Sequence, residues 1–152
     1  MTARVLIVDD SAAIRHALRQ RFAVPEIQIL AEADTVRSAI ASALELPLDA
    51  VVLDLHLPDG NGLTVLREVK AAKPDLPVFI HSSDASSLWK ERCLAAGADG
   101  YFIKGQDILN LLSAVRARSL ERSGGRAPLA FDQATKVDGQ AEDVLASSLP
   151  PA

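Results

Sequence analysis

The sequence predicts an α/β fold of three layers, α/β/α, built from residues 3–120. The main observation is that five short apolar runs alternate with stretches whose apolar residues recur at helical spacing. Strands that alternate with helices imply right-handed crossovers and a parallel sheet covered by helices on both faces. The second observation is size, because 152 residues with 49% apolar composition are enough to bury one core.

Five runs are predicted to be strands because they are short and rich in β-branched or aromatic residues. This composition is typical of strands that are buried on both faces. In chain order the predicted strands are Val5–Val8, Ile27–Ala31, Val51–Leu53, Val78–Ile80 and Tyr101–Ile103.

The segments between and after these strands are predicted to be amphipathic helices, because their apolar residues recur at steps of three and four. Gly97 is expected to end the fourth helix. The five apolar stripes comprise Ile14, Ala17, Leu18 and Phe22; Val36, Ile40 and Leu44; Leu63, Leu66 and Val69; Cys93 and Leu94; and Ile108, Leu111, Leu112 and Val115.

The composition disfavours several classes of function. A formal net charge of −4 argues against a nucleic-acid module, which needs a basic face. The single cysteine, Cys93, excludes an intramolecular disulfide framework and fits a reducing compartment. No apolar run approaches the roughly 20 residues of a membrane span, and the first residues do not form a signal peptide. We therefore expect a cytoplasmic protein that neither enters a membrane nor binds DNA directly.

The composition changes after Arg122. The segment Ser123–Pro128 contains two glycines and a proline and is predicted to be a linker. We expect residues 1–122 to form the folded domain and residues 123–152 to be a linker followed by a disordered acidic tail.

Charged and polar residues follow four of the five predicted strands. Asp9 and Asp10 follow the first strand, Asp54 the third, Ser82 lies at the end of the fourth, and Lys104 follows the fifth. Ligand sites of such sheets lie beyond the carboxyl ends of the strands, so these side chains are expected to converge. Converging carboxylates repel one another by up to a few kcal/mol per pair. Lys104 offsets part of this charge, and a divalent cation would offset more.

Oxygen ligands favour Mg²⁺, which takes one or two carboxylates and accepts a phosphoryl oxygen. Mg²⁺ and a lysine beside a carboxylate are also suited to phosphoryl transfer, in which the carboxylate can become an aspartyl phosphate. Asp54 is predicted to be the nucleophile because it stands alone after the middle strand. The adjacent acids Asp9 and Asp10 are better suited to bind the metal, and the pair Asp10-Ser11 must also cap the following helix.

Four segments together carry a family resemblance. They read VLIVDDSAAIR, VVLDLHLPDGNGLTVL, PVFIHSS and AGADGYFIKG, and they occur in this order over residues 3–120. The chain thereby resembles the receiver domain of bacterial two-component response regulators. The resemblance implies a flavodoxin-like fold, with a five-stranded parallel sheet in the order 2-1-3-4-5.

The resemblance also implies a metal site. Asp9 and Asp10 would bind Mg²⁺, and Asp54 together with the main-chain carbonyl of His56 would complete the protein ligands. The partner that supplies the phosphoryl group would be a sensor histidine kinase.

The resemblance assigns further roles around Asp54, the implied phosphoacceptor. Ser82 would hydrogen-bond the phosphoryl group and Lys104 would contact its oxygens. Tyr101 occupies the position of the aromatic switch, whose movement changes the face formed by the fourth helix, fifth strand and fifth helix. His56 and Asp84 occupy positions that tune how water reaches the phosphoryl group.

The chain departs from the commonest pattern at Gly105, where many receivers have a proline. This glycine suggests the regulator class that usually carries a helix-turn-helix output, but that output needs roughly 60 residues more than residues 123–152 offer. We therefore expect a stand-alone receiver that signals to an unknown protein target, with a possible homodimer through the switched face.

Three alternatives remain open on the sequence alone. The domain could be a phosphorelay intermediate that passes phosphate to a histidine phosphotransfer protein. It could be a phosphatase of the haloacid-dehalogenase type, although such enzymes usually have a second acid where this chain has His56. It could also be an inert receiver-like dimerisation module, but no acid or lysine of the motif is missing. The favoured interpretation is a self-phosphorylating phosphoacceptor and not a turnover enzyme.

Overall fold

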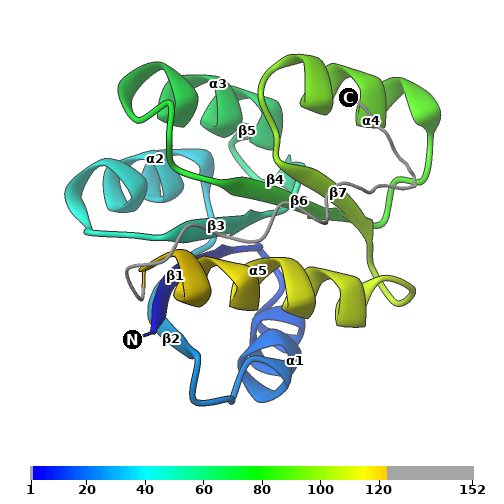
Figure 1. Ribbon diagram of the computed structural model, residues 1–152. Helices are drawn as coiled ribbons and strands as arrows, with labels where there is room; N and C mark the ends of the chain where they lie inside the picture. Colours follow the sequence, from blue (N-terminus) through cyan, green and yellow to red (C-terminus); the bar gives the residue numbers. More distant parts are fainter. Residues whose placement is uncertain (1, 123–152) are drawn as a thin grey trace.

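The computed structural model describes residues 2–122, which form a twisted five-stranded sheet with helices on both faces (Figure 1). All neighbouring strands of this sheet are parallel. Its strands, in spatial order, are β2 (Ile27–Ala33), β1 (Ala3–Val8), β3 (Ala50–Leu53), β6 (Val78–Ser82) and β7 (Gly100–Ile103). This confirms the predicted order 2-1-3-4-5, since the short strands β4 (His56–Leu57) and β5 (Gly60–Asn61) form a separate antiparallel hairpin.

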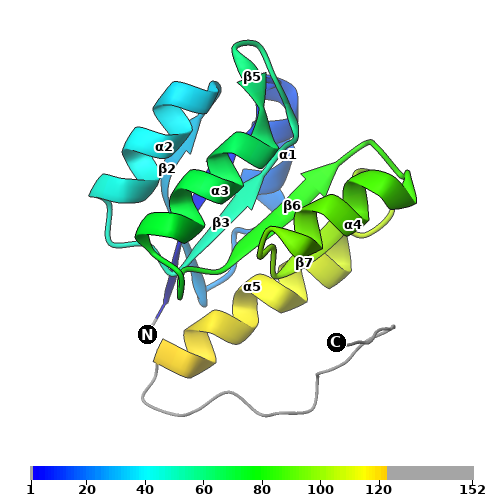
Figure 2. The same ribbon diagram turned by 90° about the horizontal axis from the view of Figure 1, so that it is seen from above.

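The helices form two outer layers (Figures 1 and 2). α1 (Ala12–Arg21) and α5 (Ile108–Arg122) lie on one face of the sheet. α2 (Val36–Glu45), α3 (Gly62–Ala72) and α4 (Ser87–Ala95) lie on the other. The predicted three-layer α/β/α architecture is therefore confirmed.

The core has two halves because side chains alternate between the faces of a strand. On β1, Leu6 and Val8 join the buried cluster under α2, α3 and α4, whereas Val5 and Ile7 join the cluster under α1 and α5. All four side chains are at most 1% exposed. The strand that carries Asp9 is thus fixed by apolar packing on both sides.

Two of the predicted strands are not buried on both faces as expected. The outer strands β2 and β7 are mostly half-buried, whereas β1, β3 and β6 are almost wholly buried. The reason is position in the sheet, because an edge strand has a neighbour on one side only. A short apolar run does not reveal whether it will become an edge.

Three apolar stripes also need correction. In α2 the buried residues are Ala39 and Ala43, and Leu44 is 41% exposed. In α4 Cys93 is buried as predicted, but Leu94 is 44% exposed. Ala17 of α1 is exposed as well. Each helix buries a narrower strip than its apolar spacing suggested: Leu18 alone in α1, Ala39 and Ala43 in α2, and Cys93 in α4.

Specific residues mark the beginning of α1 and the end of α4. Ser11, not Asp10, is the N-cap of α1, and its hydroxyl accepts the amide of Ile14 at 3.2 Å. The cap frees the Asp10 carboxylate for another role. Gly97 follows the C-terminal end of α4 with φ of +104°, a conformation that favours glycine.

The predicted linker and acidic tail, residues 123–152, lie outside the described residues. None of the helices in the described part of the chain combines the length and the apolar character that a membrane crossing requires.

Candidate functional site

The carboxyl edge of the sheet brings together residues from three strands. Asp9 follows β1, Asp54 follows β3 and Lys104 follows β7. The Lys104 Nζ atom lies 2.8 Å from Asp9 Oδ2 and 3.1 Å from Asp54 Oδ2. The predicted convergence of these side chains is therefore present. Both carboxylates are almost fully buried, so water contributes little to screening their charges.

Asp10 completes a cluster of three acids. Carboxylate oxygens of Asp9, Asp10 and Asp54 all lie within 4.8 Å of one another. Asp9 Oδ2 is buried and, although Lys104 is close, it accepts no hydrogen bond of good geometry from the described residues. One ammonium group, paired with Asp9 and Asp54, offsets only part of the negative charge of the three carboxylates. This oxygen-rich donor set fits Mg²⁺.

The electrostatics of the cluster follow from burial and proximity. Burial raises the pKa of Asp54, and the neighbouring Asp9 carboxylate adds to this effect, so that Lys104 only partly offsets it. Burial acts to lower the pKa of Lys104, but the carboxylates of Asp9 and Asp54 outweigh it and the pKa is raised. Lys104 therefore stays a cation, and Asp54 is a more basic carboxylate than usual.

The loop after β7 holds Lys104 in place. The Lys104 amide donates to the carbonyl of Ser82 at 2.9 Å, which extends the pairing of β6 and β7. The Asp107 carboxylate accepts the amide of Ile103 at 2.9 Å and closes the loop from the far side. Gly105 makes the turn with φ of +81°. Lys104 is thus anchored on both sides of its own position.

Ser82, Asp84 and Tyr101 form a chain beside the cluster. Ser82 is fully buried, and its hydroxyl oxygen accepts the amide of Asp84 at 3.0 Å. The Tyr101 hydroxyl donates to the Asp84 carbonyl at 2.5 Å. The amide of Ser86 lowers the pKa of Asp84, whose carboxylate accepts it at 2.9 Å. The Asp84 side chain is therefore engaged with its own loop.

The segment that follows β3 is tightly folded around Asp54. The amide of His56 donates to Asp54 Oδ1 at 3.4 Å, while the side chain of His56 is exposed. Gly62 lies so close that a Cβ atom there would be 2.2 Å from the Asp54 carbonyl oxygen. Only glycine fits at this position, and the close approach fixes the main chain that presents Asp54.

Several residues that support the site were not identified from the sequence. The carboxylate of Asp59 accepts the amides of Val36 and Arg37 at the start of α2, at 2.6 and 3.1 Å. The His81 side chain at the end of β6 is buried, with 4% exposure. Arg15 donates to the carbonyl of Asp9 at 2.7 Å. No local pattern reveals these contacts, because their partners are distant in sequence or are main-chain atoms.

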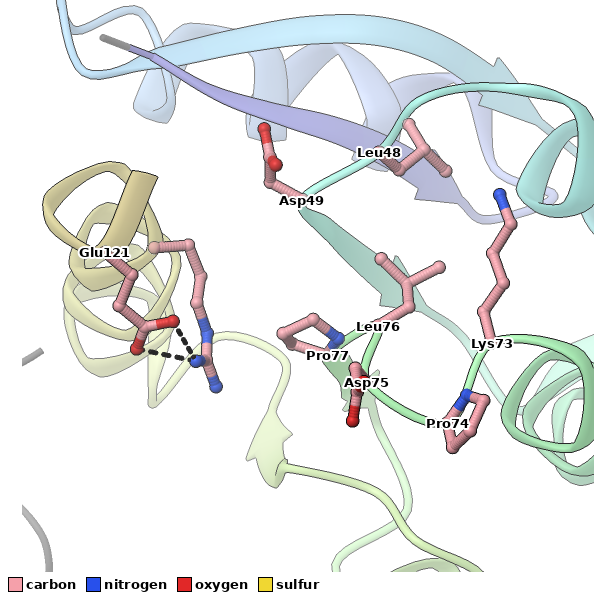
Figure 3. Close-up of a pocket in the computed structure, with 9 residues that line it drawn as sticks. Leu48, Asp49, Lys73, Pro74, Asp75, Leu76, Pro77 and Glu121 are labelled. Atoms are coloured by element: carbon pink, nitrogen blue, oxygen red, sulfur yellow. Dashed lines mark hydrogen bonds and ion pairs between the residues drawn. The ribbon is translucent and has the colours of Figure 1, made fainter. Parts of the chain in front are cut away.

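A hollow of about 500 Å³ lies at the opposite edge of the sheet (Figure 3). Its wall includes Leu48, Leu76 and Pro77, which precede strands, together with Arg118 and Glu121 near the end of α5. The Arg118 guanidinium is paired with both oxygens of Glu121, at 2.8 and 2.7 Å. The hollow is separate from the acidic cluster, which lies at the carboxyl ends of the strands.

The fold and this edge define a class of protein, the doubly wound α/β domains whose site lies beyond the carboxyl ends of parallel strands. Comparison with protein families makes the assignment specific, since residues 5–116 match the response regulator receiver domain. The chain belongs to this family. Receiver domains are phosphoaccepting signalling domains of two-component systems; they interact with histidine kinases and downstream targets, and they bind Mg²⁺ at an acidic pocket.

Curated relatives support the same assignment. The chain is 36% identical over 115 residues to a putative transcriptional regulator of Pseudomonas aeruginosa, covering 76% of this chain and 56% of the relative. It is 35% identical over 121 residues to the DNA-binding transcriptional activator DevR/DosR of Mycobacterium tuberculosis, covering 79% and 56%. The chain thus spans about half the length of the curated relatives it matches.

Solved structures share the fold. The response regulator domain of Thermotoga maritima CheB superimposes with a TM-score of 0.73 at 25% identity, covering 79% of this chain and 98% of that one. A LuxR-family two-component response regulator from Aurantimonas gives 0.73 at 29% identity, covering 84% and 90%. These similarities favour the receiver interpretation over the phosphatase alternative.

Proposed function

We propose that Asp54 is the phosphoacceptor of this receiver domain and takes its phosphoryl group from a histidine kinase or a small acyl phosphate. The carboxylate lies at the carboxyl end of the central strand, with Lys104 3.1 Å from its Oδ2 atom. This contact is the observation that carries the proposal, because it places a cation where a transferred phosphoryl group would bring negative charge.

In the proposed reaction, a carboxylate oxygen of Asp54 forms a bond to phosphorus. The bond from phosphorus to the donor nitrogen or oxygen breaks, and the donor leaves with its electron pair. The basic character of the buried Asp54 carboxylate favours its role as nucleophile. Lys104 neutralises charge on the phosphoryl oxygens throughout, and Ser82 donates its hydroxyl proton to one of them.

The proposed metal ligands are the carboxylates of Asp9, Asp10 and Asp54 and the main-chain carbonyl of His56. When bound, Mg²⁺ supplies positive charge to the phosphoryl oxygens. The close grouping of the three carboxylates, with a single neighbouring ammonium group, supports this ligand set. In the same proposal, the exposed His56 and the loop residue Asp84 tune the access of water to the phosphoryl group.

Phosphorylation is proposed to change the face formed by α4, β7 and α5. A phosphoryl group on Asp54 attracts Ser82, which alters the Ser82–Asp84–Tyr101 chain and repacks Tyr101. Leu88 of α4 and Leu109 of α5 are 54% and 66% exposed on these helices and offer apolar contacts to a protein target or a second copy. Onward transfer to a histidine phosphotransfer protein is the alternative use of the same group. Target binding and onward phosphoryl transfer are both compatible with a cytoplasmic domain formed by residues 1–122.

The test is mass spectrometry after treatment with acetyl phosphate and Mg²⁺. The wild-type chain is expected to gain one phosphoryl group, which Asp54→Ala abolishes. Asp75→Ala, at an exposed acid before β6, is the matched control and should label like the wild type. Undiminished labelling of Asp54→Ala would refute the assignment of the phosphoacceptor. Transfer of label to an added histidine phosphotransfer protein would favour the relay.

A further inference from the structure

We propose that Arg15 and Glu32 form a positioning pair that sets the affinity of the acidic cluster for Mg²⁺. The inference rests on the proposed function, because it concerns the same metal site. Neither residue belongs to the cluster itself. Arg15 lies in the first turns of α1, and Glu32 lies near the end of the edge strand β2.

The Arg15 guanidinium joins the main chain of Asp9 to the side chain of Glu32, which is distant in sequence. Its Nη1 atom donates to the main-chain carbonyl of Asp9 at 2.7 Å, and its Nε atom donates to Glu32 Oε1 at 2.9 Å. The side chains of Arg15 and Glu32 are only 19% and 26% exposed. Arg15 therefore connects β2 to the turn that carries the acids.

Glu32 is held in its place by a second arginine. Arg19, one turn further along α1, donates from Nη1 to Glu32 Oε2. Burial acts to raise the pKa of Glu32, but the hydrogen bonds and charges of Arg19 and Arg15 outweigh it and the pKa is lowered. Glu32 stays ionised at neutral pH and orients Arg15 as a charge-assisted hydrogen-bond partner.

The carbonyl that receives Arg15 belongs to the peptide unit between Asp9 and Asp10. Rotation of this peptide unit would displace the carboxylates of Asp9 and Asp10, the two adjacent acids proposed to bind the metal. The Asp9 amide is already fixed, since it donates to the Ala33 carbonyl at 3.0 Å. Arg15 fixes the other side of the same residue. Mg²⁺ demands nearly ideal octahedral geometry at roughly 2.0–2.1 Å, so a small displacement of two ligands weakens binding.

A purely electrostatic role for these residues makes the opposite prediction for one of them. Removal of the Arg15 charge makes the surroundings more negative and would strengthen Mg²⁺ binding. Removal of the Glu32 charge would weaken it. A positioning role predicts that loss of either side chain weakens binding. The sign of the Arg15 effect therefore separates the two explanations.

The experiment is calorimetric titration of the full chain with Mg²⁺ alone. We expect Arg15→Met and Glu32→Ala each to weaken binding about tenfold, the low end of the usual effect of residues that orient metal ligands. The double variant should bind Mg²⁺ no more weakly than Arg15→Met does, because both substitutions break the same contact between Arg15 and Glu32. Glu32→Gln keeps an acceptor for Arg15 and should stay within about threefold of the wild type.

The matched control is Arg4→Met, which removes an ion pair with Asp49 at the other end of β1, where Nε and Oδ2 lie 3.2 Å apart. Its Mg²⁺ affinity should equal that of the wild type. Acetyl phosphate labelling provides a second measurement. The maximal rate of Arg15→Met at saturating Mg²⁺ should equal that of the wild type, and only the Mg²⁺ concentration for half the maximal rate should rise.

The outcomes separate this inference from the proposed function. A wild-type chain that binds no Mg²⁺ would overturn the proposed function. A wild-type chain that binds Mg²⁺, with Arg15→Met binding as tightly or more tightly, would overturn only the positioning role. Equal affinities of Glu32→Ala and Glu32→Gln would do the same, since these two variants have the same charge. Glu32→Gln also keeps the test decisive if Glu32→Ala does not fold.

Discussion

The Tyr101 hydroxyl donates a 2.5 Å hydrogen bond to the main-chain carbonyl of Asp84, across the loop between β6 and α4. The Asp84 amide donates in turn to Ser82 Oγ. Tyr101 and Ser82 are thus linked through a single residue, and a displacement of Ser82 towards Asp54 would disturb the contact of Tyr101. These two hydrogen bonds physically connect Ser82 to Tyr101, as the proposed switch requires.

Tyr101→Phe tests the connection. The substitution retains the ring and removes the hydrogen bond, so we expect the free energy of unfolding to fall by about 1 kcal/mol. Amide hydrogen exchange should become faster in residues 83–87 and remain unchanged in β1. Urea unfolding and exchange measured by mass spectrometry check these effects. Unchanged exchange in residues 83–87 would contradict a role of this bond in holding the loop.

Lys104→Met should destabilise the fold because it leaves buried carboxylates without their cation. We expect a loss of about 3 kcal/mol in the absence of metal, which saturating Mg²⁺ partly restores. Lys70→Met, which breaks a 2.8 Å ion pair with Asp99 away from the site, is the control and should cost less than about 1 kcal/mol. Urea unfolding with and without Mg²⁺ provides the comparison. Equal losses for the two variants would contradict the charge argument.

Asp54→Asn should stabilise the metal-free fold at pH 7 by on the order of 1 kcal/mol, because it removes one of the mutually repelling carboxylates. The pKa of Asp54 is raised in the folded state. Protonation of Asp54 therefore stabilises the wild-type fold at low pH, and this contribution is lost as the pH rises through the raised value. The gain in unfolding free energy of Asp54→Asn over the wild type should therefore shrink as the pH is lowered towards 3.8. Urea unfolding over a range of pH values in the presence of a chelator measures it.

His81 is predicted to make the fold sensitive to acid. Burial, together with the nearby Lys104 cation, lowers its pKa from 6.5 to about 4. The unfolded chain therefore takes up a proton between pH 6.5 and 4 that the folded chain refuses, and about 3 kcal/mol of stability is lost as the pH falls through this window.

His81→Leu should remove most of this loss, while His16→Gln, at an exposed position of α1, should retain it. Unfolding free energies at pH 7.5, 6 and 5 give the comparison. A wild-type chain and His81→Leu with parallel pH profiles would show that His81 does not cause the acid sensitivity.

Gly62→Ala should disrupt the segment that presents Asp54. Its Cβ atom would lie 2.2 Å from the Asp54 carbonyl oxygen and 2.9 Å from Leu55 Cα, and main-chain atoms cannot easily move away. We expect a loss of roughly 3 kcal/mol and slower labelling by acetyl phosphate. Gly105→Ala meets no atom within 4 Å and is disfavoured only by its positive φ, at a cost of about 1 kcal/mol. Thermal unfolding of both variants should show this order.

Much of the fold could be predicted from the sequence because its signals are local. The alternation of apolar runs and helical stripes indicated five parallel strands with crossovers. The residues that follow the strands indicated a site at the carboxyl edge of the sheet, formed by Asp9, Asp10, Asp54 and Lys104. The order of the strands and the roles of the site residues came from the four motifs taken together. The order is confirmed, whereas the roles remain proposals.

Contacts between distant segments could not be predicted in this way. Apolar spacing placed Leu44 and Leu94 in the core, yet both side chains are exposed, and α2 buries Ala39 and Ala43 instead. Spacing along a helix does not determine which strip of the helix faces the sheet, because that depends on tertiary packing. The half-burial of β2 and β7 likewise depends on which strands lie at the edges.

Local patterns in the amino-acid sequence were enough to predict the class of fold and the residue types at the carboxyl edge, since both depend on periodicity and on the residues that come directly after each strand. How these residues are supported follows from contacts made in the folded chain. Arg15 reaches the Asp9 carbonyl, Asp59 caps a helix that begins far earlier in the chain, and Gly62 lies against the main chain of Asp54. These relationships join main-chain atoms to side chains far along the chain, and a carbonyl or amide partner leaves no mark in the amino-acid pattern.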